Sequence, residues 1–179
     1  MSKALYQAIS RKNLSEVQEL LDSGENIEST WRRRTPLIHA IMFGTPEITH
    51  YLLECGANVN APSNDKDGKT ALHWCAMQGT IHEMRLLLEY GAEVDVRDEF
   101  AGFTPLMLAV RGIKDVQEKV TLLLDAGADI NAKNTRWGLS TLWCATQEAA
   151  TDLVRYLVER GADIHTRNQN GNTLLMSLA

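Results

Sequence analysis

The feature that most constrains this chain is a five-residue phrase that recurs along it. The phrase reads Gly56-Ala-Asn-Val-Asn, Gly91-Ala-Glu-Val-Asp, Gly127-Ala-Asp-Ile-Asn and Gly161-Ala-Asp-Ile-His. A second phrase recurs at a nearly constant distance before the first. Its copies are Thr35-Pro-Leu-Ile-His-Ala, Thr70-Ala-Leu-His-Trp-Cys-Ala, Thr104-Pro-Leu-Met-Leu-Ala and Ser140-Thr-Leu-Trp-Cys-Ala. A weaker copy begins at Lys3, and a partial copy begins at Thr173. Two phrases in fixed register predict a stack of small repeated units.

The residues of one unit predict two short helices and a loop. Thr35 can cap a helix whose first turn accepts Pro36, because the missing N–H is not needed there. Gly44-Thr-Pro ends that helix, and apolar residues at 48, 51, 52 and 53 have the spacing of a second helix. Gly56 then suits the left-handed position that follows a helix. Such a pair of helices is too small to bury its own apolar face, so stability is expected from stacking on neighbouring units.

These phrases resemble the ankyrin repeat, whose unit of about 33 residues opens with a T-P-L-H-x-A pattern. The resemblance implies an all-α ankyrin-repeat solenoid of stacked helix-turn-helix units with projecting β-hairpin-like loops. It covers residues 1–179 as a single domain, with units near 1–29, 30–64, 65–98, 99–134 and 135–167 and a partial unit at 168–179. Extra residues are expected in the loop at 62–68 and around 111–116, at or between the helices of the fourth unit.

Composition narrows the classes of function. The 179-residue chain carries a net charge of -5, which disfavours nucleic acid as a partner. No apolar run is long enough for a signal peptide or a membrane span, so no membrane partner is expected. Three cysteines at wide spacings argue against a disulfide framework and for a reducing compartment. The predicted location is intracellular and cytoplasmic, with the nucleus or delivery into a host cell left open.

No catalytic, metal or cofactor site is predicted. Gly68-Lys-Thr resembles the end of a phosphate-binding loop, but the full motif needs glycine where Ser63 stands. The five histidines and three cysteines form no zinc-binding spacing. Cys75 and Cys144 fall within opening helices and are interpreted as buried packing residues. The family resemblance implies that His73 hydrogen-bonds the backbone of a neighbouring loop.

The resemblance also implies that a partner meets a concave surface made of loop tips and the exposed side of each opening helix. The residues expected to bind a partner there are Trp31, Arg32, Arg34, Met42, Phe43, Lys66, Lys69, Met77, Phe100, Phe103, Arg111, Arg136 and Trp137. The same surface is expected to include Asp67, Gln78, Ala101, Leu139, Gln147, Glu148, Gln169, Asn170 and Asn172. Aromatic residues are only 6% of the chain, yet five of them fall in these slots, and Trp and Arg are enriched in binding hot spots. For Phe100, Phe103 and Trp137, packing against loop stems is an equal alternative; Trp74 and Trp143 are expected to pack.

The sequence therefore predicts a non-catalytic protein–protein interaction module, of the scaffold or adaptor kind. Its partner would be a protein or peptide with an acidic residue and a hydrophobic anchor, to match a basic and aromatic patch around Trp31 and Arg32. One alternative is a regulatory or inhibitory domain that docks on a catalytic domain of its own chain or complex. An enzyme using a surface Cys or His is a third, disfavoured alternative.

The last residues form an unusual end for a solenoid. Residues 173–179 are predicted to be an opening helix with no second helix to close it, and four of the seven residues are large and apolar. A terminal repeat normally carries a polar outer face. We therefore expect either that the natural chain continues past Ala179 or that another molecule covers this edge, a second copy of the chain being one candidate.

Overall fold

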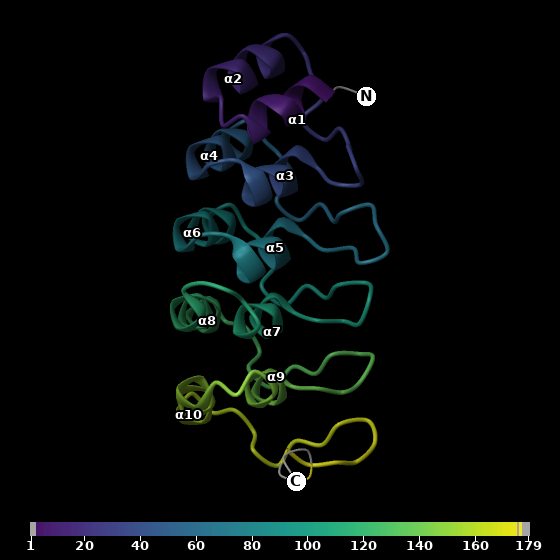
Figure 1. The fold of residues 1–179 in the computed structure, drawn as a ribbon, viewed down its shortest axis with the longest axis vertical. Coiled ribbons are helices and arrows are strands. Elements are labelled where there is room, and N and C mark those ends of the chain that lie inside the picture. Colours follow the sequence, from purple (N-terminus) through teal and green to yellow (C-terminus); the bar gives the residue numbers. More distant parts are fainter. Residues whose placement is uncertain (1–2, 175, 177–179) are drawn as a thin grey trace.

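The computed structural model describes residues 3–174 and 176, and it stacks helix pairs in a single column with a loop projecting from each pair (Figure 1). The inner helices, beside the loops, are α1 (Lys3–Ser10), α3 (Pro36–Phe43), α5 (Ala71–Gln78), α7 (Pro105–Val110) and α9 (Thr141–Gln147). The outer helices are α2 (Leu14–Asp22), α4 (Pro46–Glu54), α6 (Ile81–Glu89), α8 (Val116–Asp125) and α10 (Thr151–Glu159). Within the described residues only isolated β-bridges occur. The predicted all-α solenoid is confirmed.

The inner helices begin where the repeated Thr or Ser predicts. The Thr35 hydroxyl accepts the backbone N–H of Ile38 at 3.3 Å, and Ser140 does the same for Trp143 at 3.3 Å. Proline occupies the first turn of α3, α4 and α7. A side-chain acceptor at this position satisfies one of the N–H groups that no helical carbonyl can reach.

The outer helices end at the repeated glycine. Gly56, Gly91, Gly127 and Gly161 have φ of 86°, 83°, 93° and 96°, in the left-handed region that side chains disfavour. The N–H after each glycine returns to a helical carbonyl, as Ala57 does to Leu52 at 3.0 Å. This closing turn reverses the chain toward the next loop, and it confirms the repeat prediction.

One apolar core runs along the column between the two rows of helices. Leu37, Leu72, Leu106 and Leu142, which share one position in the inner helices, are all buried, as are Ile48 and Leu87 of the outer row. These side chains belong to one continuous cluster that joins the two helices of each unit and also joins consecutive units. Each unit is therefore stable only through its neighbours.

His73 locks an inner helix to the next loop. Its Nδ1 accepts the N–H of Thr70 at 3.2 Å, so Nε2 carries the proton and donates to the Phe103 carbonyl at 3.0 Å. The ring is fully buried, and burial lowers its pKa. This geometry confirms the structural role that the family resemblance implies.

The projecting loops are hydrogen-bonded to one another in a ladder. Asn64 donates its N–H to the Arg33 carbonyl at 2.7 Å, and Glu99 donates to Asp67 at 2.8 Å. Thr135 likewise donates to Ala101 at 2.9 Å, and Gln169 donates to Trp137 at 3.0 Å. The loops therefore form one continuous backbone surface beside the inner helices.

An irregular segment lies where the sequence places extra residues in the fourth unit. Residues 111–115 connect α7 to α8 and include Asp115 at φ 51°. Of the helix expected over 173–179, residues 175 and 177–179 lie outside the described residues. Leu174 is buried and Met176 is exposed. No helix among the residues described is long and apolar enough to cross a membrane.

Candidate protein-interaction surface

The first candidate region, the N-terminal patch, consists of Trp31, Arg32, His39 and Phe43. The half-buried Trp31 ring lies 5.5 Å from Tyr6 and 5.9 Å from His39 between ring centroids. The exposed Arg32 guanidinium stacks 4.5 Å from the centre of the Trp31 ring. Phe43 lies 4.8 Å from His39 and leaves 45% of its surface exposed. The patch is thus an apolar ring cluster with one exposed cation above it.

His39 supports this patch from below. Its Nε2 hydrogen-bonds the Ser10 hydroxyl at 2.8 Å, which ties α3 to α1. Burial, reinforced by the positive charges of Arg34 and Arg32, lowers the pKa of His39 to about 4. The ring is therefore neutral at pH 7, and the charge of the patch comes from arginine.

Arg34 does not join Arg32. Its guanidinium lies 5.2 Å from the Trp74 ring of the next unit, and its carbonyl accepts the Tyr6 hydroxyl at 2.8 Å. Arg32 and Arg34, both expected on the partner-binding surface, thus stack on different rings. The cause is the tight turn at Arg32 and Arg33, whose φ values of 50° and 67° reverse the chain between them.

The second region, the C-terminal patch, consists of Phe100, Phe103, Arg111, Arg136 and Trp137. Trp137 lies 6.4 Å from Phe100 and 5.9 Å from Phe103. The Arg136 guanidinium stacks on both exposed rings, 4.7 Å from Phe100 and 5.0 Å from Trp137. Arg111 lies 5.7 Å from Phe103 and pairs with Glu148 at 3.3 Å. The structure thus brings together five of the residues expected to bind a partner.

Two residues of the predicted binding surface are buried: Lys69, which was expected to be exposed, and Phe103, for which packing was the equal alternative. The Lys69 ammonium pairs with Asp67 at 2.9 Å and with the buried Asp98 at 3.5 Å, so it joins two consecutive loops. Phe103 is 6% exposed, and its ring lies against the Trp137 ring and the Arg111 guanidinium. Met42 and Met77 are half-buried against the core, whereas Lys66 is exposed at a loop tip.

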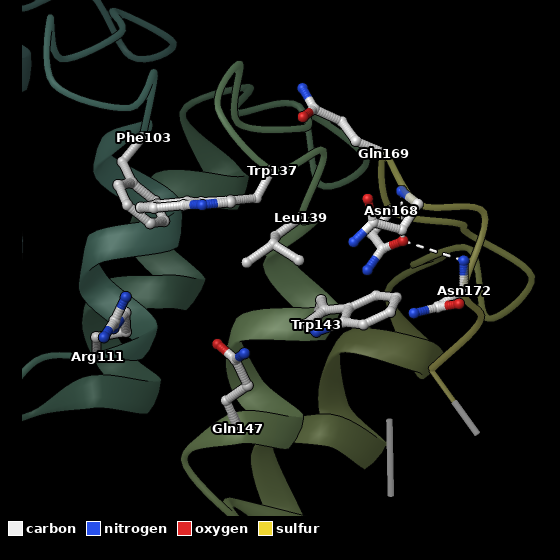
Figure 2. Close-up of a pocket in the computed structure, with 10 residues that line it drawn as sticks. Phe103, Arg111, Trp137, Leu139, Trp143, Gln147, Asn168, Gln169 and Asn172 are labelled. Carbon is white, nitrogen blue, oxygen red and sulfur yellow. Dashed lines mark hydrogen bonds between the residues drawn. The ribbon is translucent and has the colours of Figure 1, made fainter. Parts of the chain in front are cut away.

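The C-terminal patch borders a pocket of 470 Å³ between α7, α9 and the last two loops (Figure 2). The lining residues are Phe103, Arg111, Trp137, Leu139, Trp143, Gln147, Asn168, Gln169, Asn170 and Asn172. A second hollow of 450 Å³ lies on the other side of Phe103 and Arg111. Both have the size of a site for a small molecule or a few side chains.

Sequence reasoning missed Trp143 and Asn168 in this pocket. Trp143 stands at the position of the repeated phrase that His73 occupies in the third unit, so it was interpreted only as packing. It is buried, yet its ring forms part of the pocket wall. The usable signal was the tryptophan itself, because the first four units carry Tyr6, Ile38, His73 and Met107 at that position.

Burial raises the pKa of Cys75 and raises that of Cys144 to about 11, so both thiols are protonated at pH 7. Among the described residues, no group of three or more His, Cys, Asp or Glu side chains could hold a metal ion. Exposed rings, guanidinium groups and amides are the groups that the surface offers.

Comparison with known proteins agrees with this architecture. The family model for ankyrin repeats matches residues 2–63, 59–134 and 114–179. The chain therefore belongs to the ankyrin-repeat family, and such an array of repeats is a protein-interaction module.

Individual relatives cover the chain but extend beyond it. It is 35% identical to an ankyrin repeat protein of Rickettsia felis, over 73% of this chain and 42% of the relative. It is 29% identical to the B-cell lymphoma 3 protein homolog of Mus musculus, over 97% of this chain and 40% of the relative. The crystal structure of the ankyrin repeat domain of Bcl-3, a member of the IkappaB protein family, matches with a TM-score of 0.83 and 27% identity, over 97% of this chain and 78% of that one. The chain thus spans less than half the length of these two curated relatives.

Proposed function

We propose that this domain binds a protein or peptide partner, without catalysis, through the face made by its loops and inner helices. The observation that carries the proposal is that this face holds both aromatic–arginine patches. In each patch a guanidinium group is stacked on an exposed or half-exposed ring, 4.5 Å away for Arg32 and 4.7 Å away for Arg136. Within the described residues neither guanidinium forms an ion pair with a carboxylate.

The chemistry of the two patches specifies the partner. An unpaired guanidinium can form a bidentate pair with a carboxylate, and the ring beneath it holds the planar group in place. Each patch also has an exposed ring that offers apolar area for an anchor, Phe43 in the N-terminal patch and Trp137 in the C-terminal patch. Because the loop ladder already holds these groups, little conformational entropy is lost on binding. The matching partner carries acidic residues beside hydrophobic ones.

Affinity capture from cells that express the protein tests the proposal. The variant Arg32→Glu with Arg136→Glu changes both patches, and Arg85→Glu changes an exposed arginine of the outer helix α6 as a matched control. We expect a set of proteins that wild type and Arg85→Glu retain and that the double variant retains at least 10-fold less, given about 1–2 kcal/mol per hot-spot residue. Equal retention by all three proteins, or no specific retention, contradicts the proposal.

A second candidate function is docking on a catalytic domain of the same chain or complex. The observation that favours it is the length of the relatives, of which the chain covers 42% and 40%. Under this candidate the captured protein is the remainder of the full-length gene product or an enzyme bound to it. Adding the purified domain to that enzyme then changes its activity, and the double variant does not.

A further inference from the structure

The pocket of Figure 2 has the features of an anchor site for a partner's side chain. It belongs to the face that we propose to bind a partner, so its assignment rests on the proposed function. We propose that it binds one large apolar side chain, aromatic or aliphatic, of an extended peptide segment in the partner. An acidic residue beside that side chain pairs with Arg136. This assignment names the partner's chemistry at a site of defined shape.

One wall of the pocket is Trp143, at a repeat position whose residue varies: Tyr6, Ile38, His73 and Met107 hold it in the other units. In the third unit His73 bridges to the Phe103 carbonyl at 3.0 Å and fills the space between its helix and the next loop. In the fifth unit Trp143 stands at that position, and no hydrogen bond joins its indole to the loop within the described residues. The space between α9 and the last loop is therefore lined by an indole face, with Asn172 across from it (Figure 2).

One wall of the pocket is held rigid. Trp137 is 40% exposed, but its ring contacts Phe103 at 5.9 Å and the Arg136 guanidinium at 5.0 Å. Its backbone carbonyl accepts the Gln169 N–H at 3.0 Å, which fixes the loop. An exposed indole that is already ordered before binding is the kind of residue that dominates interfaces.

The rim of the pocket suits a peptide backbone. Gln147, Asn170 and Asn172 present side-chain amides for which no hydrogen bond occurs within the described residues, and each amide offers both donors and an acceptor. A backbone in extended conformation presents N–H and C=O groups alternately, so amides can pair with both. The side chain between those backbone groups would then enter the space between Trp137 and Trp143.

Charge selects the kind of side chain. Arg111 is the sole charged residue among those that line the pocket, and no carboxylate lines it. A lysine or methylated lysine anchor would lose its hydration there without a compensating negative charge. The cation next to the pocket, Arg136, has no carboxylate partner in the described part of the chain, so it is available to an acidic residue of the peptide.

Selection from a phage-displayed random peptide library tests the assignment. Gln147 is exposed and ends α9, so Gln147→Trp would fill the pocket without touching the core. Gln117 is exposed on the outer helix α8, away from the proposed face, so Gln117→Trp is the matched control. We expect wild-type protein to enrich peptides with a large apolar residue next to Asp or Glu. A synthetic peptide of that consensus should bind Gln147→Trp and Arg136→Glu at least 10-fold more weakly, and Gln117→Trp with unchanged affinity.

Several outcomes would overturn the assignment. Basic peptides, or no enriched peptides, would do so, as would peptides whose affinity Gln147→Trp leaves unchanged. If the peptides respond only to Arg32→Glu, the proposed function stands and the pocket assignment fails. Light scattering on the same samples measures the oligomeric state. A wild-type dimer that Gln147→Trp dissociates would assign the pocket to self-association and overturn the peptide assignment. Melting curves of all variants establish that each one is folded.

Discussion

At the scale of single residues, His39 makes stability depend on pH. The folded protein keeps this ring neutral down to pH about 4, whereas the unfolded chain takes up a proton near 6.5. Between these pH values the unfolded state therefore binds more protons than the folded state. The contribution of His39 to stability is complete above pH 6.5 and is lost as the pH falls toward 4.

We expect His39→Gln to remove about 2 kcal/mol of the acid-induced loss in unfolding free energy between pH 6.5 and 4. His165→Gln, at an exposed histidine, is the matched substitution that removes a histidine outside the buried ring cluster. Urea unfolding at several pH values measures both slopes. A His39→Gln profile parallel to wild type would show that His39 does not titrate in this way.

Lys119 is a buried lysine whose charge lowers the stability of the fold. Its side chain is fully buried in α8, and its ammonium reaches one acceptor, the Ala76 carbonyl, at 3.5 Å. In the part of the chain that is described, no carboxylate lies within ion-pair distance of it. Burial lowers its pKa, which is the mark of a charge held at a cost.

We therefore expect Lys119→Met to raise the free energy of unfolding by about 1–3 kcal/mol, because an apolar chain of similar length replaces a poorly paired cation. Lys114→Met, at an exposed lysine of the neighbouring connection, should change it by less than about 0.5 kcal/mol. Denaturant titration gives both values. Destabilisation by Lys119→Met would mean that the ammonium holds a structural role that its contacts do not reveal.

At the scale of elements, glycine has two different roles. After α8, Gly127 has φ 93°, and a Cβ there would meet nothing within 4 Å. In the fifth loop, Gly138 has φ 68°, and a Cβ there would lie 2.9 Å from the backbone nitrogen of Gln169. The first glycine only turns the chain, whereas the second also lets two loops approach closely.

This difference predicts different consequences for Gly→Ala. Gly127→Ala should cost about 1 kcal/mol of unfolding free energy through backbone conformation alone. Gly138→Ala should cost more, and it should increase amide hydrogen exchange in the last loop, because Gln169 must move away from Trp137. Equal costs with unchanged exchange at Gln169 would contradict the role given to loop contact.

At the scale of the whole molecule, each unit contacts only its neighbours, so position in the column decides how far a defect spreads. Leu106 in α7 and Leu157 in α10 are both fully buried, but α7 lies mid-column and α10 lies near the end. Leucine-to-alanine substitution at either should cost about 2–5 kcal/mol locally.

We expect Leu106→Ala to lower the stability of the whole array. Leu157→Ala should release mainly the last unit, with hydrogen exchange increasing in α9 and α10 and remaining slow in α1 to α6. Hydrogen exchange with mass spectrometry distinguishes the two patterns. The same global increase in both variants would mean that the column unfolds as one cooperative unit.

The sequence by itself determined the architecture, because its repeated Thr and Gly positions act locally. A cap at Thr35 and a left-handed Gly56 depend on nearby backbone, so they can be predicted from a phrase of a few residues. The same is true of the buried leucines of each helix, whose spacing follows the helical period. The sequence also predicted that Phe100, Arg136 and Trp137 lie on one face, because their loop positions recur from unit to unit.

Only the tertiary structure decided what each side chain on that face does. Arg32 and Arg34 are two residues apart, but a turn between them gives each a different ring. Lys69 is buried because Asp98, on the next loop, draws its ammonium inward. Trp143 lines a pocket because of the space between α9 and a loop that comes later in the chain. These outcomes depend on distances between units, which are set when the units stack and which no single phrase encodes.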